Sequence, residues 1–282
     1  MRALLALALA VAAPAASQAP PAPPTVPFRL SGAPTQGGLV TGEALPGTVS
    51  VALRTAGAPD APAALSGRRF MIGFDRDAPP SAELVATMAD GRRVSTTLAV
   101  APRAWRLERI DAPYRAGRTD AEFEAVRPGE LQRIAAARAV VTGAAGWLEP
   151  MRWPARGRVS GLFGAQRVYQ GKPGSFHSGV DLALPTGAPV VAPASGVVVL
   201  AAEPSRPFTL EGNLLIIDHG GGLSSAFLHL SRIDVGLGQR VAAGQPVGAV
   251  GATGRATGPH LHWSLRWRDA RLDPLLVAGP VL

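Results

Sequence analysis

The sequence contains no cysteine among its 282 residues. This excludes disulfide frameworks and thiolate metal sites, so any bound metal must be held by histidine or carboxylate side chains. Lysine is nearly absent as well, since Lys172 is the only one, and arginine carries almost all of the positive charge. Aromatic residues make up only 5%, whereas glycine (33) and proline (27) are abundant. This composition favours turn-rich β-structure over a helical bundle.

Runs of basic residues interleaved with aromatic residues are also missing, which argues against nucleic-acid binding. The formal net charge of +8 instead favours an anionic partner such as a cell-wall polymer or a lipid head group. A length of 282 residues allows about two domains, and 47% hydrophobic residues are enough to form their cores.

The start of the chain has the pattern of a secretory signal peptide. Met1-Arg2 is followed by an apolar run at 3–13, which is about half of the roughly 20 residues that a transmembrane helix needs. Small residues follow, and we expect cleavage near Ser17. No cysteine lies there to carry a lipid anchor, so we expect an exported, soluble mature protein without stable membrane insertion.

The rest of the chain divides by pattern into a β-rich part, a helical part and a second β-rich part. The predicted organisation is a signal peptide at 1–17, a proline-rich lead-in at 18–27, a β-sandwich-like accessory domain at 28–112, a helical linker at 113–145 and an all-β domain with an antiparallel sheet at 146–282. The predicted fold class is therefore mainly β.

Within the accessory domain, alternating or continuous apolar residues predict short strands. These strands are 49–53, 70–74, 84–88 and 94–100. Between the last two, Asp90-Gly91 predicts a tight hairpin turn, because glycine accepts a positive φ.

The linker is predicted to contain two helices, at 119–126 and 128–141. Pro128 suits the first turn of the second helix, where its missing N–H costs nothing, and Gly143 can end that helix. In the C-terminal part, the polar segment 165–176 is predicted to be a flexible loop.

All five histidines lie in the last 106 residues, and the first 176 residues have none. They are His177, His219, His229, His260 and His262. Random placement would seldom produce such clustering, so it indicates a functional site.

Two of these histidines belong to the segment 260–267, in which polar and apolar residues alternate strictly. This pattern predicts a half-buried strand on which His260 and His262 share one face. They could be ordinary polar residues on a solvated face, or they could share a metal or a substrate.

A second motif favours the interpretation that these histidines bind a metal ion. His177 and Asp181 are four residues apart with a glycine between them, a spacing that occurs often by chance. Combined with the downstream His-x-His motif, it supplies three ligands suited to zinc and leaves one coordination position open, as catalytic zinc sites do.

Several motifs appear in the order found in the lysostaphin/LytM-type zinc metallopeptidases of bacterial cell walls, which this chain resembles over about 153–276. They are His177-x3-Asp181, Phe227-Leu228-His229-Leu230 and Gly258-Pro259-His260-Leu261-His262, with supporting context at 192–198, 218–220, 241–245 and 251–254. The upstream segments resemble accessory parts of exported Gram-negative members. The resemblance therefore implies a location in the periplasm.

The resemblance also implies a role for each site residue. His177, Asp181 and His262 would bind one Zn²⁺ ion. His260 and His229 would be catalytic, supplying acid/base assistance and stabilising the oxyanion as water attacks a peptide carbonyl. A glutamate base is not available from a His-Glu-x-x-His motif, because the sequence has none.

The chain departs from the family at Phe227, where a tyrosine is usual, so a hydroxyl contact there is lost. We expect His219 to be structural and Arg167 to be a surface residue. Gly251, Gly254 and Gly258 would either let the backbone approach an extended substrate or serve as plain turn residues.

The implied function is an endopeptidase that hydrolyses peptide cross-links of peptidoglycan, whose stems would be its partner. The alternatives are a non-catalytic cell-wall-binding regulator or activator of another wall hydrolase, and a structural metal site in an adhesion module. The bond cleaved, and any partner in the division machinery or among other wall hydrolases, stay open.

Overall fold

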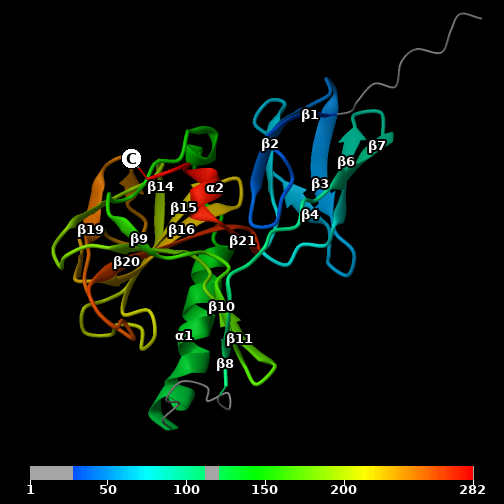
Figure 1. The fold of residues 1–282 in the computed structure, drawn as a ribbon. Coiled ribbons are helices and arrows are strands. Elements are labelled where there is room, and N and C mark those ends of the chain that lie inside the picture. The colour runs from blue at the N-terminus through cyan, green and yellow to red at the C-terminus, as the bar shows by residue number, and fades with distance from the viewer. Residues whose placement is uncertain (1–27, 112–120, 282) are drawn as a thin grey trace, which may run out of the picture.

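The computed structural model describes residues 28–111 and 121–281 (Figure 1). The predicted signal peptide and lead-in lie outside the described residues. Antiparallel sheets dominate, which confirms the predicted mainly β class. In the described ranges, no helix is both long and apolar enough to cross a membrane.

The N-terminal part consists of two antiparallel sheets whose inner faces pack together, as predicted for a β-sandwich-like unit. Strands β1, β2 and β5 form one sheet, and β4, β3, β6 and β7 form the other. Their bounds are β1 Phe28–Ser31, β2 Leu39–Ala44, β3 Thr48–Arg54, β4 Ala61–Ala63, β5 Arg69–Gly73, β6 Ser81–Met88 and β7 Arg93–Ala99. Val40, Phe70 and Ile72 from the first sheet join Leu53 and Leu84 from the second in one buried cluster.

Two sequence expectations for these sheets can be compared with the structure. The predicted hairpin at Asp90-Gly91 is confirmed, since β6 and β7 pair antiparallel and Gly91 has a φ of +84°. The apolar alternation at 49–53 is only partly correct. Val51 and Leu53 are buried, but Val49 is 59% exposed, because the pairing of β3 with β6 shifts register between Thr48 and Ser50.

The C-terminal part is built on an eight-stranded antiparallel sheet in the order β18-β14-β15-β16-β20-β12-β9. The eighth strand, β21, pairs with the C-terminal half of β20, on the side opposite β16. Its strands are β9 Arg158–Gly161, β12 Val180–Ala183, β14 Gly196–Ala201, β15 Asn213–Gly220, β16 Leu223–Leu230, β18 Arg240–Val241, β20 His260–Trp267 and β21 Ala270–Leu272. A small sheet lies beside it, made of β13 Pro189–Val191, β19 Pro246–Ala249 and β17 Arg232–Ile233. Two short helical segments, η1 Gly146–Leu148 and α2 Pro274–Val277, complete this part.

Strand β20 confirms the period-two alternation predicted from its sequence. Its apolar residues are at most 1% exposed; they are Leu261, Trp263, Leu265 and Trp267. Trp263 packs edge-on against Trp153, with ring centroids 5.3 Å apart. The opposite face of the strand carries His260, His262, Ser264 and Arg266.

The segment 165–176 is a hairpin, so the prediction of a flexible loop is wrong. Strands β10 (Gln166–Tyr169) and β11 (Lys172–Phe176) pair antiparallel through a two-residue turn. Gln170 and Gly171 both have positive φ, 45° and 83°, which is the backbone that matches the twist of a tight hairpin. Strand β8 (Leu107–Ile110) adds to this hairpin in parallel with β10.

The linker contains one described helix, α1 (Ala121–Ala139), where the sequence predicted two. Pro128 lies in the helix interior, where it removes a backbone hydrogen bond. Contacts from both sides of this position hold the helix together. Both terminal nitrogens of Arg127 bind the Glu211 carboxylate at 2.7 Å, and Glu130 accepts a hydrogen bond from the Thr209 amide at 2.6 Å.

Helix α1 covers part of the sheet face that carries the histidines. Ile134 and Ala137 pack against Val199, Ile216 and Ala226. Ala226 lies opposite Ser264 in the pairing of β16 with β20, and opposite residues of an antiparallel pair project to the same face. In Figure 1, α1 extends downward from the large sheet beside β8, β10 and β11.

The N-terminal sheets contact the C-terminal part through the segment after β5. Arg76 is only 6% exposed, and its guanidinium donates to the Gly164 carbonyl and to the Gln166 side chain. The same guanidinium lies over the rings of Trp105 and Phe176, 5.1 and 4.7 Å from their centroids. Arg76 therefore connects the N-terminal sheets to the hairpin that leads into His177.

Replacing Arg76 with alanine should destabilise the protein by about 2–4 kcal/mol, because it leaves buried acceptors unpaired and removes two ring contacts. Urea denaturation should show a lower midpoint. The matched control is Arg92→Ala, whose side chain is 70% exposed and pairs only with Asp90, and it should change stability by less than about 0.5 kcal/mol. Equal midpoints for the two variants would contradict the role of Arg76.

Candidate metal centre

The structure brings together three residues that were predicted to be metal ligands. The distances are 3.0 Å from His177 Nε2 to Asp181 Oδ1, 3.0 Å from His177 Nε2 to His262 Nδ1, and 2.9 Å from His262 Nδ1 to Asp181 Oδ1. Among the described residues, this is the group of histidine and carboxylate side chains able to hold a metal ion.

Strand pairing explains why the three side chains meet. Asp181 in β12 lies directly opposite His262 in β20, so both side chains project from the same face. His177 directly follows β11, and its backbone N–H donates to the carbonyl of Ala165. The β10–β11 hairpin therefore places His177, the third candidate ligand, next to Asp181 and His262, whose positions are set by the sheet register.

A hydrogen bond at the outer nitrogen of His177 leaves its inner nitrogen available for a metal. His177 Nδ1 lies 3.0 Å from the Leu162 carbonyl and donates to it, so Nε2, which faces Asp181, is the nitrogen that can give up its proton to bind a metal ion. A backbone carbonyl is a common partner for the second nitrogen of a metal-binding histidine. His262 instead presents Nδ1 to the cluster.

The charges of the cluster suit a cation. Burial acts to raise the pKa of Asp181, but hydrogen bonds from His177 and His262 outweigh it and hold that pKa well below its usual range. Burial lowers the pKa of His262. Burial acts to lower the pKa of His177 as well, but the hydrogen bond and charge of Asp181 raise it, so a metal ion would displace a proton shared by these two residues. A carboxylate and two imidazoles form a donor set that fits a zinc-type ion, whose tetrahedral ligands lie about 3.3 Å apart at bond lengths of about 2.0 Å.

Two glycines provide the space that these ligands occupy. A Cβ atom at Gly179 would lie 2.7 Å from His262 Nε2 and 2.5 Å from the Trp263 carbonyl oxygen. A Cβ atom at Gly161 would overlap the carboxylate of Asp181. Neither glycine stands out in the sequence as a site residue, although Gly179 lies between two expected ligands in the His177-x3-Asp181 motif.

His229 and His260, the predicted catalytic pair, lie next to the ligands. Their ring centroids are 4.8 Å apart, and His260 Nε2 is 3.8 Å from Asp181 Oδ1. Each donates its Nδ1–H to a backbone carbonyl at 2.8 Å, that of Thr253 for His229 and that of Gly258 for His260. In the neutral form of each ring, Nε2 therefore carries the lone pair.

The position of His229 also depends on its backbone. It has a φ of 64°, a left-handed conformation that is uncommon outside glycine and often marks functional sites. Its N–H donates to the Glu211 carbonyl. Burial, together with the nearby His260 and His262, lowers the pKa of His229, which favours the neutral imidazole.

The other residues considered from the sequence lie away from the metal centre. His219 is fully buried, with one ring nitrogen 3.0 Å from the Ser195 carbonyl and the other 2.8 Å from Ser225 Oγ, as expected for a structural residue. Arg167 is exposed and pairs with Glu108. Phe227 lies opposite Trp263 on the core side of the sheet and is fully buried.

Gly251 and Gly254 have a packing role within the loops. Added Cβ atoms would meet backbone atoms of residues 229–231 at Gly251 and of residues 210–212 at Gly254. Gly258 has nothing within 4 Å of such an atom, and its carbonyl orients His260.

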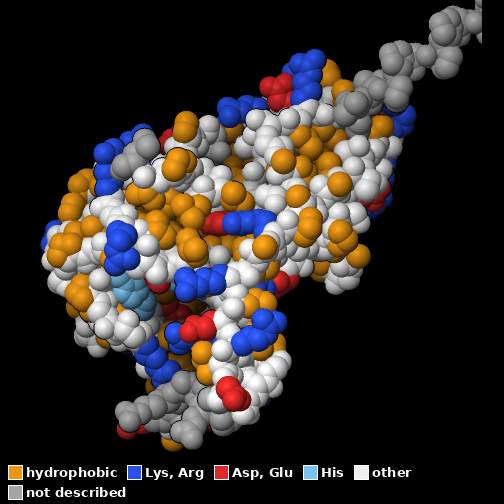
Figure 2. Space-filling model, in the orientation of Figure 1, with side chains coloured by type: hydrophobic (Ala, Val, Ile, Leu, Met, Phe, Trp, Pro, Cys, Tyr) orange, Lys and Arg blue, Asp and Glu red, His pale blue; other side chains and the backbone are white. Residues whose placement is uncertain are grey.

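A cavity of about 830 Å³ adjoins His177. Its lining includes Ser160 from β9, Leu162 directly after that strand, Phe176 from β11, and Arg106 from the segment that enters β8. Figure 2 shows histidine side chains reaching the surface beside a recess of the molecule. The contribution of β8 was not apparent from the sequence, because it depends on parallel pairing between distant segments.

Residues 175–274 match the sequence model of a protein family described as Peptidase family M23. A crystal structure of an M23 peptidase from Pseudomonas aeruginosa is similar to this chain, with a TM-score of 0.64 and 30% sequence identity. The similarity covers 87% of this chain and 95% of that one.

Two curated proteins are also similar in sequence. Peptidoglycan DD-endopeptidase ShyA of Vibrio cholerae is 41% identical over 125 residues, which is 44% of this chain and 28% of ShyA. Cell division protein DipM of Caulobacter vibrioides is 31% identical over 173 residues, which is 61% of this chain and 25% of DipM. The matches span about a quarter of the length of these relatives.

The family match contains all five histidines and Asp181. The Pseudomonas aeruginosa protein is related over nearly its whole length. We conclude that this chain belongs to peptidase family M23.

Proposed function

We propose that this protein is a zinc-dependent endopeptidase that hydrolyses peptide cross-links of peptidoglycan. The observation that carries the proposal is the triangle of ligand atoms on His177, Asp181 and His262, with sides of 2.9–3.0 Å, beside two further imidazoles. Relatives named peptidoglycan DD-endopeptidases support the substrate class.

In this proposal, His177, Asp181 and His262 hold the zinc ion. Zinc supplies a Lewis acid that polarises a peptide carbonyl and makes a water molecule more acidic. The protein holds Asp181 ionised and presents one nitrogen of each histidine, so the site needs little rearrangement to bind the ion.

His229 and His260 supply the acid/base chemistry. The Nε2 atom of His229 is free to take a proton, because its Nδ1–H is held by the Thr253 carbonyl and the ring is neutral. Once protonated, the same nitrogen can donate to the leaving amine or to the developing oxyanion. His260 has the same hydrogen-bonding arrangement, and its Nε2 lies 3.8 Å from Asp181 Oδ1, so we propose that it acts beside the attacking water.

The remaining parts of the chain would direct export of the protein and position its peptidase domain. We propose that residues 1–17 direct export to the periplasm, that 28–112 form an accessory domain, and that 113–145 link it to the peptidase domain at 146–282. Arg76 supports this division of labour, since it anchors the accessory part to the hairpin that carries His177.

The alternative is a non-catalytic regulator of another wall hydrolase, which the relation to a protein named cell division protein DipM brings into consideration. Retention of all three ligands and of both neighbouring histidines favours an enzyme. A wild-type protein that binds zinc but leaves purified peptidoglycan intact would favour the regulator.

The proposed roles of His262 as a zinc ligand and His260 as an acid/base residue give one prediction. His262→Ala should lose both zinc and activity, because it removes a ligand. His260→Ala should keep most of its zinc but lose activity at least 100-fold, because it removes only acid/base assistance. The measurements are zinc content by atomic emission and release of peptides from purified peptidoglycan.

His229→Ala is the companion variant, and it should behave like His260→Ala. Digestion that persists unchanged in all three variants would refute the enzyme. Equal loss of zinc from the His260 and His262 variants would show instead that the ligand assignment is wrong.

The space at Gly179 gives a second prediction. Gly179→Ala should weaken zinc binding at least tenfold, because the added methyl group pushes on the His262 ring and the Trp263 carbonyl. Competition with a chromophoric chelator would measure the affinity. The matched control is Gly236→Ala, where an added Cβ meets nothing within 4 Å. If Gly179→Ala kept the wild-type affinity, the His262 ring would not be constrained as described.

A further inference from the structure

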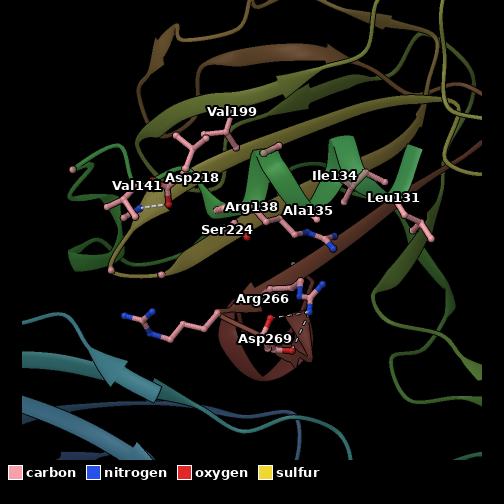
Figure 3. A pocket seen from close by; sticks show the side chains of 18 residues that line it. Leu131, Ile134, Ala135, Arg138, Val141, Val199, Asp218, Ser224, Arg266 and Asp269 are labelled. Atoms are coloured by element: carbon pink, nitrogen blue, oxygen red, sulfur yellow. Dashed lines mark hydrogen bonds and ion pairs between the residues drawn. The ribbon is translucent and has the colours of Figure 1, made fainter. Parts of the chain in front are cut away.

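A second pocket, distinct from the metal centre, lies where the end of α1 meets the far end of β20 (Figure 3). Its volume is about 640 Å³, which is within the usual range for small-ligand sites. Its walls include Leu131, Ile134 and Arg138 from α1, and Arg266 at the end of β20.

Two arginines reach toward each other across this pocket. Arg138 extends from α1 and Arg266 from β20, and Figure 3 shows their guanidinium groups on facing walls. The Nε atom of Arg266 is buried and has no hydrogen-bond partner among the described residues. A buried N–H without a partner is costly, so this atom identifies a place where an acceptor is missing.

Nearby acidic residues offset only part of the positive charge of the pair. Asp218 already accepts hydrogen bonds from the Thr142 amide and hydroxyl and from the Gly220 amide. Asp269 has a fully exposed carboxylate 3.9 Å from Arg266, a separation at which an exposed pair contributes little.

The surroundings of Arg138 and Arg266 lower the pKa values of both side chains. Arg138 is an exposed residue, but the protein packed around its guanidinium, with repulsion from Arg266, lowers its pKa to about 10. Burial also lowers the pKa of Arg266. Both groups stay charged at neutral pH, and an anion between them would relieve their mutual repulsion.

The charge of the lining selects a monoanion. Three arginines (Arg138, Arg266 and Arg268) and two aspartates (Asp218 and Asp269) line the pocket, which leaves a net charge of +1 (three minus two). A carboxylate would neutralise it, whereas a phosphate dianion would overcompensate. A planar guanidinium also matches a carboxylate through two parallel hydrogen bonds.

The remaining lining is apolar and favours a ligand with a hydrocarbon part. Leu131, Ile134, Val141 and Val199 contribute it. The pocket is separate from the metal, since Arg266 lies four residues beyond His262, or about 13 Å along the strand. Between them, Ser264 is buried.

We propose that this pocket binds a carboxylate carried on a short apolar group, held between Arg138 and Arg266. Such a group occurs at the C-terminus of a peptide and on an acidic side chain. The ligand would bridge α1 to β20 and so stabilise the docked position of the helix.

Calorimetric titration of the full chain would test the proposal, and the arginine variants below separate binding in this pocket from binding at the metal centre. The probes are N-acetylleucine for a C-terminal carboxylate, N-acetylglutamic acid α-amide for an acidic side chain, N-acetylleucinamide as the neutral control, and inorganic phosphate. We expect saturable binding of at least one carboxylate, and weaker or no binding of the amide and of phosphate. The carboxylate that binds more tightly identifies the source.

Arg266→Gln and Arg138→Gln should each weaken carboxylate binding at least tenfold. Arg138 is exposed on α1, so its variant tests the pocket even if the Arg266 variant folds poorly. Arg158→Gln, an exposed arginine on β9, is the matched control and should bind as the wild type does. The proposal fails if no carboxylate binds, if the amide or phosphate binds as tightly, or if Arg138→Gln keeps wild-type affinity.

Discussion

The pairing of β12 with β20 is the constraint on which the site depends. It places Asp181 opposite His262, and a slip of β20 by one residue would turn His262 to the core face, away from Asp181. The buried face of β20 prevents this slip, since Trp263 and Trp267 would then be exposed. The same apolar alternation that stabilises the sheet therefore also sets the positions of two ligands.

Backbone carbonyls orient the histidine rings of the site. Leu162, Thr253 and Gly258 each hold the Nδ1 atom of one histidine, so that three imidazoles present Nε2 toward a common region. These carbonyls belong to loops whose own conformations depend on close contacts, as at Gly251 and Gly254. The His177 and His229 rings are thus oriented by loops distant in sequence, whereas His260 is oriented by a carbonyl two residues before it.

Strand β20 and the candidate site could be predicted from the sequence because they leave local patterns, whereas the choice of ligands within the site rested on the family resemblance. Alternation revealed β20, and the clustering of histidines indicated the site. Other features depend on tertiary contacts. Pro128 lies inside one helix because Arg127 and Glu130 bind the loop at 209–211, and hairpin β10–β11 has a turn, Gln170-Gly171, without the most typical residues. The parallel addition of β8 leaves no periodic signal.

The polar face of β20 also explains why one strand can serve two sites. His260, His262, Ser264 and Arg266 form a continuous row, and the sequence analysis used only its first half. Helix α1 divides the row, since Ile134 and Ala137 pack over the neighbouring Ala226, leaving the metal centre on one side and the arginine pocket on the other. The helix has few buried residues of its own, namely Glu130, Ile134 and Ala137. Its docking must therefore rely on its two ends, Arg127 with Glu211 at one and the pocket of Arg138 and Arg266 at the other. An anion in that pocket would remove the repulsion that opposes docking at the second end.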